Sequence, residues 1–144
     1  MKLDRVGIER RVPHAGTMCL LDAVMQWDAT SITCIACAPG ATHPLARDGT
    51  VPAVAAVEYA AQATAVHGAL LDTQVAPRAG MLAKLSEVEL HTLCIPADRG
   101  PLNVRAELLN RGASGCLYAF EVAGNRQRIA SGRLLVAFVP LSAL

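Results

Sequence analysis

Glu58 is the only formally charged side chain between Val51 and Leu71, a segment made mostly of Ala, Val and Leu. Burying an ionised carboxylate without a partner costs several kcal/mol, so a chain that keeps one in its most apolar helix either pairs it or uses it. A His-Pro pair, His43 and Pro44, lies shortly before this helix. Because an acid and a base that converge on one cleft form a proton-transfer pair, we predict that Glu58 and His43 carry out acid–base chemistry.

The residues alone leave a second interpretation of the carboxylate open. Glu58 could instead be structural, paired with an arginine from a neighbouring strand, for instance Arg105 or Arg133. Two further histidines are not expected at the site: His67 is predicted to be a core or interface residue, and His91 to be exposed in the middle of a strand. The interpretation of Glu58 therefore depends on what surrounds it in the fold.

The five cysteines are odd in number and scattered along the chain: Cys19, Cys34, Cys37, Cys94 and Cys116. The N-terminal segment carries charges throughout and does not resemble a secretory signal, so we expect reduced thiols and a cytoplasmic location. Cys34 and Cys37 spell C-x-x-C, but the alternating sequence around them predicts a strand, in which positions three apart point to opposite faces. The pattern therefore indicates plain buried thiols, without zinc or redox chemistry.

Length and composition indicate one domain, residues 1–144, with an ordinary core. A chain of 144 residues buries roughly 70% of its unfolded surface. The hydrophobic fraction is 53% but the aromatic fraction only 3%, so many small side chains must pack closely, and such a chain often hides further apolar surface in an oligomer. Lys and Arg total 13 against 12 for Asp and Glu, a balance that gives no reason to expect nucleic acid or an anionic membrane as partner.

The apolar run from Val51 to Leu71 is long enough to raise the question of a membrane span, for which about 20 residues suffice. Glu58, Gln62 and His67 fall inside it, spaced so that no face of useful length avoids them. Many other positions are Ala, which contributes little to membrane insertion. We therefore predict a buried helix of a soluble protein, with no membrane partner.

Hydrophobic patterning predicts one long helix and about six strands. Pro52 fits the first turn of the helix, since proline there costs no hydrogen bond. From Gly80 onward, apolar residues alternate with polar ones, which is typical of half-buried antiparallel strands. The predicted strands are, approximately, Leu20–Trp27, Thr30–Cys37, Met81–Cys94, Leu102–Asn110, Cys116–Ala123 and Gln127–Val139.

A helix that is apolar all round needs cover on every side, and an antiparallel sheet wrapped around it supplies most of that cover. The sequence therefore predicts an α+β fold in which a sheet of about six strands wraps around one central helix. A single sheet cannot close completely around the helix. We expect a second copy of the chain to supply the missing cover, in a dimer with its two sheets joined edge to edge or face to face.

Three motifs carry a resemblance to a known family: Val12-Pro13-His14, Met18-Cys19-Leu20-Leu21-Asp22, and VPAVAAVEYAAQ, which begins at Val51. Together with the order of the elements, they resemble the hot-dog-fold 3-hydroxyacyl-acyl-carrier-protein dehydratases over nearly the whole chain. Within that superfamily, the sequence is most similar to the dehydratases of aryl polyene and related pigment clusters. The VPAxxxxEYxAQ block is moderately specific, whereas the remaining strands match mostly in length and order.

The resemblance implies a site and a reaction. His43 and Glu58 match the His and Glu that work together in that family from different protomers, His43 removing the C2 proton of a 3-hydroxyacyl thioester and Glu58 protonating the departing hydroxyl. The backbone N–H of Ala53 or Val54, at the helix start, would polarise the thioester carbonyl. Gln62, one turn after Glu58, would orient the carboxylate. No metal or organic cofactor is implied, and the substrate would arrive on the phosphopantetheine arm of acyl carrier protein.

Alternatives remain open for both the base and the reaction. His14 rivals His43 because it follows Pro13 in a motif shared with the family, although a supporting hydrogen bond is its favoured role. Hot-dog thioesterases also use a carboxylate on the central helix, there to activate water, and a non-catalytic subunit could bind carrier protein and partner an active paralogue. The leading hypothesis is a dehydratase that forms the trans-2-enoyl thioester in fatty-acid-like or aryl polyene biosynthesis.

Overall fold

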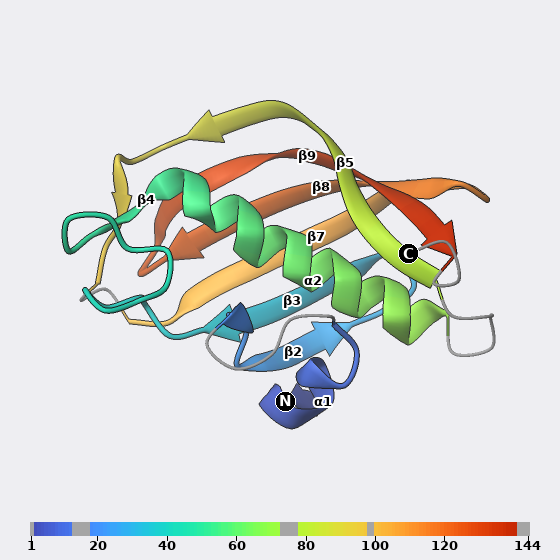
Figure 1. The fold of residues 1–144 in the computed structure, drawn as a ribbon, viewed down its shortest axis with the longest axis horizontal. Helices are drawn as coiled ribbons and strands as arrows, with labels where there is room; N and C mark the ends of the chain where they lie inside the picture. Colours follow the sequence, from blue (N-terminus) through green and yellow to red (C-terminus); the bar gives the residue numbers. More distant parts are fainter. Residues whose placement is uncertain (1, 13–17, 73–77, 98–99, 141–144) are drawn as a thin grey trace.

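A seven-stranded antiparallel sheet curves around one long helix, α2 (Ala56–Leu71), in the computed structural model of the protein (Figure 1). The structure describes residues 2–12, 18–72, 78–97 and 100–140. From one edge to the other, the strands of this sheet are β1 (Leu3–Asp4), β2 (Ala23–Trp27), β3 (Ser31–Ala36), β7 (Leu102–Arg111), β8 (Gly115–Gly124), β9 (Gln127–Pro140) and β5 (Arg78–Leu90). A separate two-stranded sheet pairs β4 (Val51–Pro52) with β6 (Cys94–Ile95).

The long strands place apolar side chains on the face of the sheet toward α2. In β7, Leu102, Val104 and Ala106 are fully buried, whereas Arg105 and Glu107 between and after them are exposed. Strand β8 alternates in a similar way, with its buried positions separated mostly by partly buried ones. Because α2 contacts β3, β7 and β8, the core lies between the helix and the concave face of the sheet. The predicted α+β fold, a sheet wrapped around one central helix, is confirmed.

Small side chains allow α2 to lie close to the sheet. Ala56, Ala60 and Ala63 are fully buried, so the helix backbone approaches the strands directly at these positions. Two large side chains, Tyr59 from the helix and Tyr118 from β8, are also buried and fill the remaining space. In the part of the chain that the structure describes, no helix combines the length and apolar character that a membrane crossing requires.

The start of the predicted helix is divided into three short pieces. Val51 and Pro52 form β4 and pair with β6, and the chain then makes one 3-10 turn, η2 (Ala53–Ala55), before α2 begins. The N–H of Ala53 donates to the carbonyl of Leu93 at 3.0 Å, which ties the helix start to the segment before β6. This second small sheet therefore fixes where the first turn of the helix lies.

The N-terminal residues form more structure than the sequence predicted. Strand β1 pairs with β2, and the short helix α1 (Arg5–Glu9) begins after Asp4, whose carboxylate accepts the N–H of Gly7 at 2.9 Å. Arg5 donates to Asp22 Oδ1 at 3.1 Å and to the carbonyl of Cys19 at 2.7 Å. Arg5 also pairs with Glu9 within α1, but these two partners lie more than ten residues along the chain, beyond the reach of local patterning.

Within the described residues, strand β5 forms an edge of the main sheet and has β9 as its one neighbour there (Figure 1). It ends before the predicted boundary, and Cys94 belongs to β6 instead. A bulge shifts its register between Ser86 and Glu89, where Glu87 has a φ of 53°. Its exposed large apolar side chains are Met81, Leu82, Leu85, Val88 and Leu90. An uncovered edge that carries apolar side chains is typical of a surface that pairs with another chain.

Candidate active site

The loop before α2 holds His43 in a series of tight turns. The N–H of His43 donates to the carbonyl of Gly40 at 3.1 Å, and the N–H of Ala46 donates to the carbonyl of His43 at 2.9 Å. Asp48 and Gly49 then have φ angles of 51° and 79°, the left-handed geometry of a tight two-residue turn. His43 is therefore held by backbone hydrogen bonds on both sides.

Both ring nitrogens of His43 have partners. The N–H of Leu45 donates to Nδ1 at 3.1 Å, and Nε2 lies 3.4 Å from the hydroxyl oxygen of Tyr59. The rings of His43 and Tyr59 stack with an interplanar angle of 18° and a centroid separation of 6.3 Å. Burial lowers the pKa of His43, so the imidazole is neutral near pH 7.

Tyr59 connects His43 to the core. Burial raises the pKa of Tyr59 to about 12, with smaller contributions from the charges of nearby Asp22 and Cys37, so its hydroxyl stays protonated and can both donate and accept a hydrogen bond. Sequence reasoning missed this residue. The available signal was its position directly after Glu58 in the VPAVAAVEYAAQ block, which places it in the first turns of the same helix.

Glu58 lies in the first turn of α2 and is half-buried in the single chain, more exposed than its apolar neighbours suggested. The fully buried Gln62 donates from Nε2 to Glu58 Oε1 at 3.1 Å and to the carbonyl of Met18 at 2.8 Å. Its Oε1 accepts the N–H of Leu20 at 2.9 Å. The contact between Gln62 and Glu58 that the one-turn spacing predicted is therefore present, and the amide that makes it is fixed by two further hydrogen bonds.

The two backbone N–H groups predicted to polarise a carbonyl differ in their availability. The N–H of Ala53 is engaged by Leu93, as described above. The N–H of Val54 belongs to the first turn of η2, where no earlier helical carbonyl precedes it, and the preceding Pro52 provides no side-chain cap. The side chain of Val54 is 55% exposed. Val54 is therefore the better placed of the two donors.

The structure brings the predicted residues together in two groups. His43 contacts Tyr59, whereas Glu58 contacts Gln62. Successive residues of a helix point about 100° apart, so the two groups lie on different sides of α2. His14, the rival to His43, lies outside the described residues.

Residues 6–142 match the model of a family described as ApeP-like, ApeP dehydratase. The chain belongs to the ApeP-like dehydratase family. This confirms the resemblance to hot-dog dehydratases related to aryl polyene clusters, and membership of the family supports a lyase-type enzyme. No curated protein matches the sequence significantly.

Solved structures share the fold of this ApeP-like chain. The dehydratase heterocomplex ApeI:P from Xenorhabdus doucetiae matches with a TM-score of 0.80 at 22% identity, over 94% of this chain and 92% of that chain. A mutant of thioesterase PA1618 from Pseudomonas aeruginosa matches with a TM-score of 0.69 at 19% identity, over 98% and 97% of the two chains. A mutant of thioesterase SAV0944 from Staphylococcus aureus matches with a TM-score of 0.64 at 18% identity, over 82% and 93%. These matches confirm the hot-dog fold.

The structure offers no support for an ion pair between Glu58 and either candidate arginine. Arg133 pairs with Glu87 at 3.1 Å. Arg105 is exposed on β7 between side chains that are buried toward α2, so it lies on the opposite face of the sheet from the helix. Neither Arg105 nor Arg133 of the same chain is therefore the partner of Glu58 in a structural ion pair.

Of the other two histidines within the described residues, His67 lies in the core as predicted. His91 is exposed as predicted, but it lies just after β5 ends and not in the middle of a strand. His67 is fully buried in the core, with Nδ1 2.8 Å from the hydroxyl of Tyr118 and Nε2 2.8 Å from the carbonyl of Asp28. His91 is exposed, and its Nε2 lies 3.1 Å from the hydroxyl of Ser131. Neither histidine contacts the group formed by His43 and Tyr59.

The two cysteines of the C-x-x-C sequence lie in different environments, as a strand would place them. The prediction that both thiols are buried is wrong for one of them. Cys34 is fully buried, and burial raises the pKa of its thiol to about 12, whereas Cys37 is exposed just after β3 ends. The backbone N–H of Cys37 donates to Asp22 Oδ2 at 2.7 Å. Among the described residues, no cluster of His, Cys, Asp and Glu side chains could hold a metal ion.

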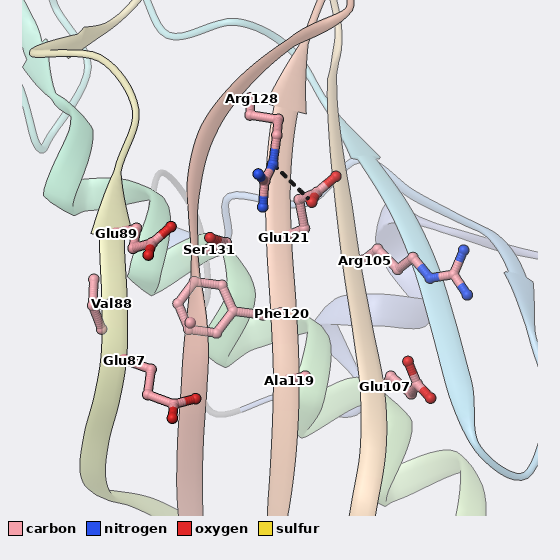
Figure 2. Close-up of a pocket in the computed structure, with 11 residues that line it drawn as sticks. Glu87, Val88, Glu89, Arg105, Glu107, Ala119, Phe120, Glu121, Arg128 and Ser131 are labelled. Atoms are coloured by element: carbon pink, nitrogen blue, oxygen red, sulfur yellow. Dashed lines mark hydrogen bonds and ion pairs between the residues drawn. The ribbon is translucent and has the colours of Figure 1, made fainter.

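A cavity of about 850 Å³ lies on the outer face of the sheet, away from this site (Figure 2). Its charged lining residues come from β5, β7, β8 and β9 and are Glu87, Glu89, Arg105, Glu107, Glu121 and Arg128. Arg128 donates to Glu121 at 3.0 Å across the cavity wall. A site for an acyl chain needs mostly apolar walls, so the residues around the start of α2 remain the candidate active site.

Proposed function

We propose that this protein removes water from a 3-hydroxyacyl thioester carried on acyl carrier protein, giving the trans-2-enoyl thioester, with Glu58 and His43 as its proton-transfer pair. Membership of the dehydratase family supports the reaction. The contact that carries the assignment of the site is Gln62 to Glu58, which orients a carboxylate in the first turn of α2. The acyl group arrives on phosphopantetheine in fatty-acid-like or aryl polyene biosynthesis, and no metal or organic cofactor takes part.

The chemistry accounts for each of these groups. The C2 proton of a thioester is weakly acidic, so its removal needs a positioned base and stabilisation of the charge that develops on the carbonyl oxygen. The N–H of Val54, at the positive end of a helix, donates a hydrogen bond to that oxygen. The hydroxyl leaves as water once it has received a proton. Gln62 keeps Glu58 in one orientation through these steps.

The site is composed of residues from two protomers in this proposal. His43 and Glu58 have their contacts on different sides of α2, so each of them meets its counterpart from the facing subunit. The open edge of β5, with exposed Met81, Leu82 and Leu85, supplies a surface for pairing with a second hot-dog subunit. That subunit is a second copy of this chain, whereas ApeI:P from Xenorhabdus doucetiae is a heterocomplex.

Mixed subunits test this composite site. We expect His43→Ala and Glu58→Ala homodimers to be inactive when each is assayed alone. After co-expression, about half of the dimers are mixed and each mixed dimer has one intact site, so about one quarter of the wild-type activity should return. Activity that does not return in dimers proven to be mixed would show that each chain carries a complete site.

A thioesterase is the second candidate because several of the structural neighbours, including the two named above, are described as thioesterases. Mass spectrometry of the carrier-bound product separates the two reactions. Loss of one water with the thioester intact supports the dehydratase, whereas release of free acid and carrier thiol supports the thioesterase. A chain that binds acylated carrier but turns it over only with a different hot-dog subunit would be a non-catalytic partner.

A further inference from the structure

The proton of neutral His43 has a defined position in this structure. A neutral imidazole carries a proton on one nitrogen and a lone pair on the other. Because the N–H of Leu45 donates to Nδ1 at 3.1 Å, Nδ1 holds the lone pair and the proton lies on Nε2. Nε2 in turn faces the hydroxyl oxygen of Tyr59, which can accept it.

The hydroxyl of Tyr59 is suited to accept the Nε2–H of His43 until a substrate oxygen takes its place. The side chain of Tyr59 is only 1% exposed, so its hydroxyl has a fixed position against the core. The Nε2 to oxygen distance of 3.4 Å is longer than the usual range of about 2.7–3.2 Å for such bonds. A substrate oxygen that binds at normal distance therefore competes well for the same N–H.

We propose that the N–H of Leu45 and the hydroxyl of Tyr59 together hold His43 with its proton on Nε2, so that His43 serves as a hydrogen-bond donor and Tyr59 is its positioning residue. The inference rests on the proposed dehydration. It changes the division of roles that the family resemblance implies, because a base needs a lone pair at Nε2. The proton acceptor is then Glu58 of the facing protomer, whose Oε1 is oriented by Gln62.

The reaction balances with this division of roles. The C2–H bond breaks, its proton passes to the carboxylate of Glu58, and its electron pair moves onto the thioester oxygen at the N–H of Val54. The electrons then return to form the C2–C3 double bond as the C3–O bond breaks. The Nε2–H of His43 donates to the departing oxygen, which takes the proton back from Glu58 and leaves as water. Glu58 ends as a carboxylate and His43 stays neutral throughout.

Nitrogen NMR of the histidine rings tests the position of the proton without any activity measurement. The chain has four histidines, and the resonances of His43 are those missing from the spectrum of His43→Gln. Above its pKa, His43 should show a directly bonded proton on Nε2 and an unprotonated Nδ1. A proton on Nδ1 in the wild-type protein overturns the proposal.

A matched pair of tyrosine variants separates positioning from general effects on the core. Tyr59→Phe should shift the Nε2 resonance of His43 and lower kcat/KM by about 3- to 10-fold, the usual effect of losing one neutral hydrogen bond. Tyr118→Phe removes the equivalent hydroxyl beside His67 and should leave the His43 resonances unchanged. Identical His43 spectra in the wild type and Tyr59→Phe would reject the role of Tyr59.

Two substitutions of the histidine itself test the donor role. Glutamine retains an N–H donor but has no basic lone pair, whereas alanine has neither. We expect His43→Gln to be at least about 10-fold more active than His43→Ala, within the range that a single transition-state donor contributes. Equal losses in the two variants would identify His43 as the base. If the wild type itself does not dehydrate the substrate, the proposed function fails, and the NMR spectrum still decides where the proton lies.

Discussion

Two histidine–tyrosine pairs lie near opposite ends of α2, and they differ in tightness and exposure. His67 is fully buried, and its two ring nitrogens each lie 2.8 Å from a partner, the hydroxyl of Tyr118 and the carbonyl of Asp28. His43 is half-buried and lies 3.4 Å from the hydroxyl of Tyr59. The pair of His67 and Tyr118 has no room for a substrate. His43, in contrast, can exchange the hydroxyl of Tyr59 for a substrate oxygen.

The comparison teaches that a lowered pKa does not by itself mark a functional histidine. Burial lowers the pKa of both His67 and His43. What separates them is access: the His67 ring is enclosed by the core, while His43 lies in a loop next to the first turns of α2. We therefore assign the first pair to stability and the second to the reaction.

Replacing each histidine with alanine should cause a different loss: activity for His43 and stability for His67. His43→Ala removes a group at the reacting centre and should lower kcat/KM by about 100-fold or more, with less than about 1 kcal/mol change in the free energy of unfolding. His67→Ala leaves the Tyr118 hydroxyl and the Asp28 carbonyl without a partner beside a cavity, and should lower the free energy of unfolding by about 3 kcal/mol. Steady-state kinetics and urea unfolding of both variants measure the two effects.

A milder substitution at His67 separates a loss of activity from a loss of folding. In His67→Gln, the glutamine side chain has no ring but keeps an N–H that can reach the carbonyl of Asp28. The variant should therefore remain folded at room temperature. If fully folded His67→Gln lost as much activity as His43→Ala, the division between a stabilising pair and a reacting pair would be wrong.

The next effect in size concerns the amide that orients the carboxylate. Gln62→Glu keeps an acceptor for the N–H of Leu20 but replaces the donor to Glu58 with a second negative charge. We expect kcat/KM to fall by about 10-fold at neutral pH, because two carboxylates one turn apart repel each other and share protons. Kinetics from pH 5 to 9 should show an altered acidic limb. An unchanged pH profile would mean that Gln62 does not orient Glu58.

Local spacing allowed much of this site to be predicted from the sequence. Glu58 and Gln62 are four residues apart on a helix, and alternation of apolar residues gave the strands that cover it. The other hydrogen bonds of Gln62, to Met18 and Leu20, join segments more than 40 residues apart and follow from no local pattern. The same holds for the contact of His43 with Tyr59, which depends on how the loop turns back onto the helix.

Acid should destabilise the fold through His67, the smallest of the predicted effects. Because burial lowers the pKa of His67 below its ordinary value of 6.5, the unfolded chain binds the proton more tightly than the folded one. The stability that neutral His67 contributes is complete above about pH 6.5 and declines as the pH falls from there toward the folded-state pKa. His43, which is more exposed, adds a smaller change of the same sign.

Urea unfolding midpoints at about pH 7.5 and pH 5.5 measure this loss, and His67→Gln should reduce it. The charged groups that also act on His67 are Asp28, which raises its pKa, and Arg111, which lowers it. Hydrogen bonds from Thr30 and Ser31 lower the pKa of Asp28 itself, so protonation of Asp28 contributes only below about pH 4, outside this interval. Equal pH dependence in the wild type and His67→Gln would contradict the assignment.

Glu58→Gln tests the central claim most directly, because glutamine keeps the shape of the side chain and removes the carboxylate that moves the proton. With a 3-hydroxyacyl carrier thioester as substrate, we expect the rate of enoyl formation to fall by about 100-fold or more. Glu107→Gln, a control on the outer face of the sheet in the central strand β7, should match the wild type. Enoyl formation by folded Glu58→Gln at a rate near that of the wild type would contradict the account.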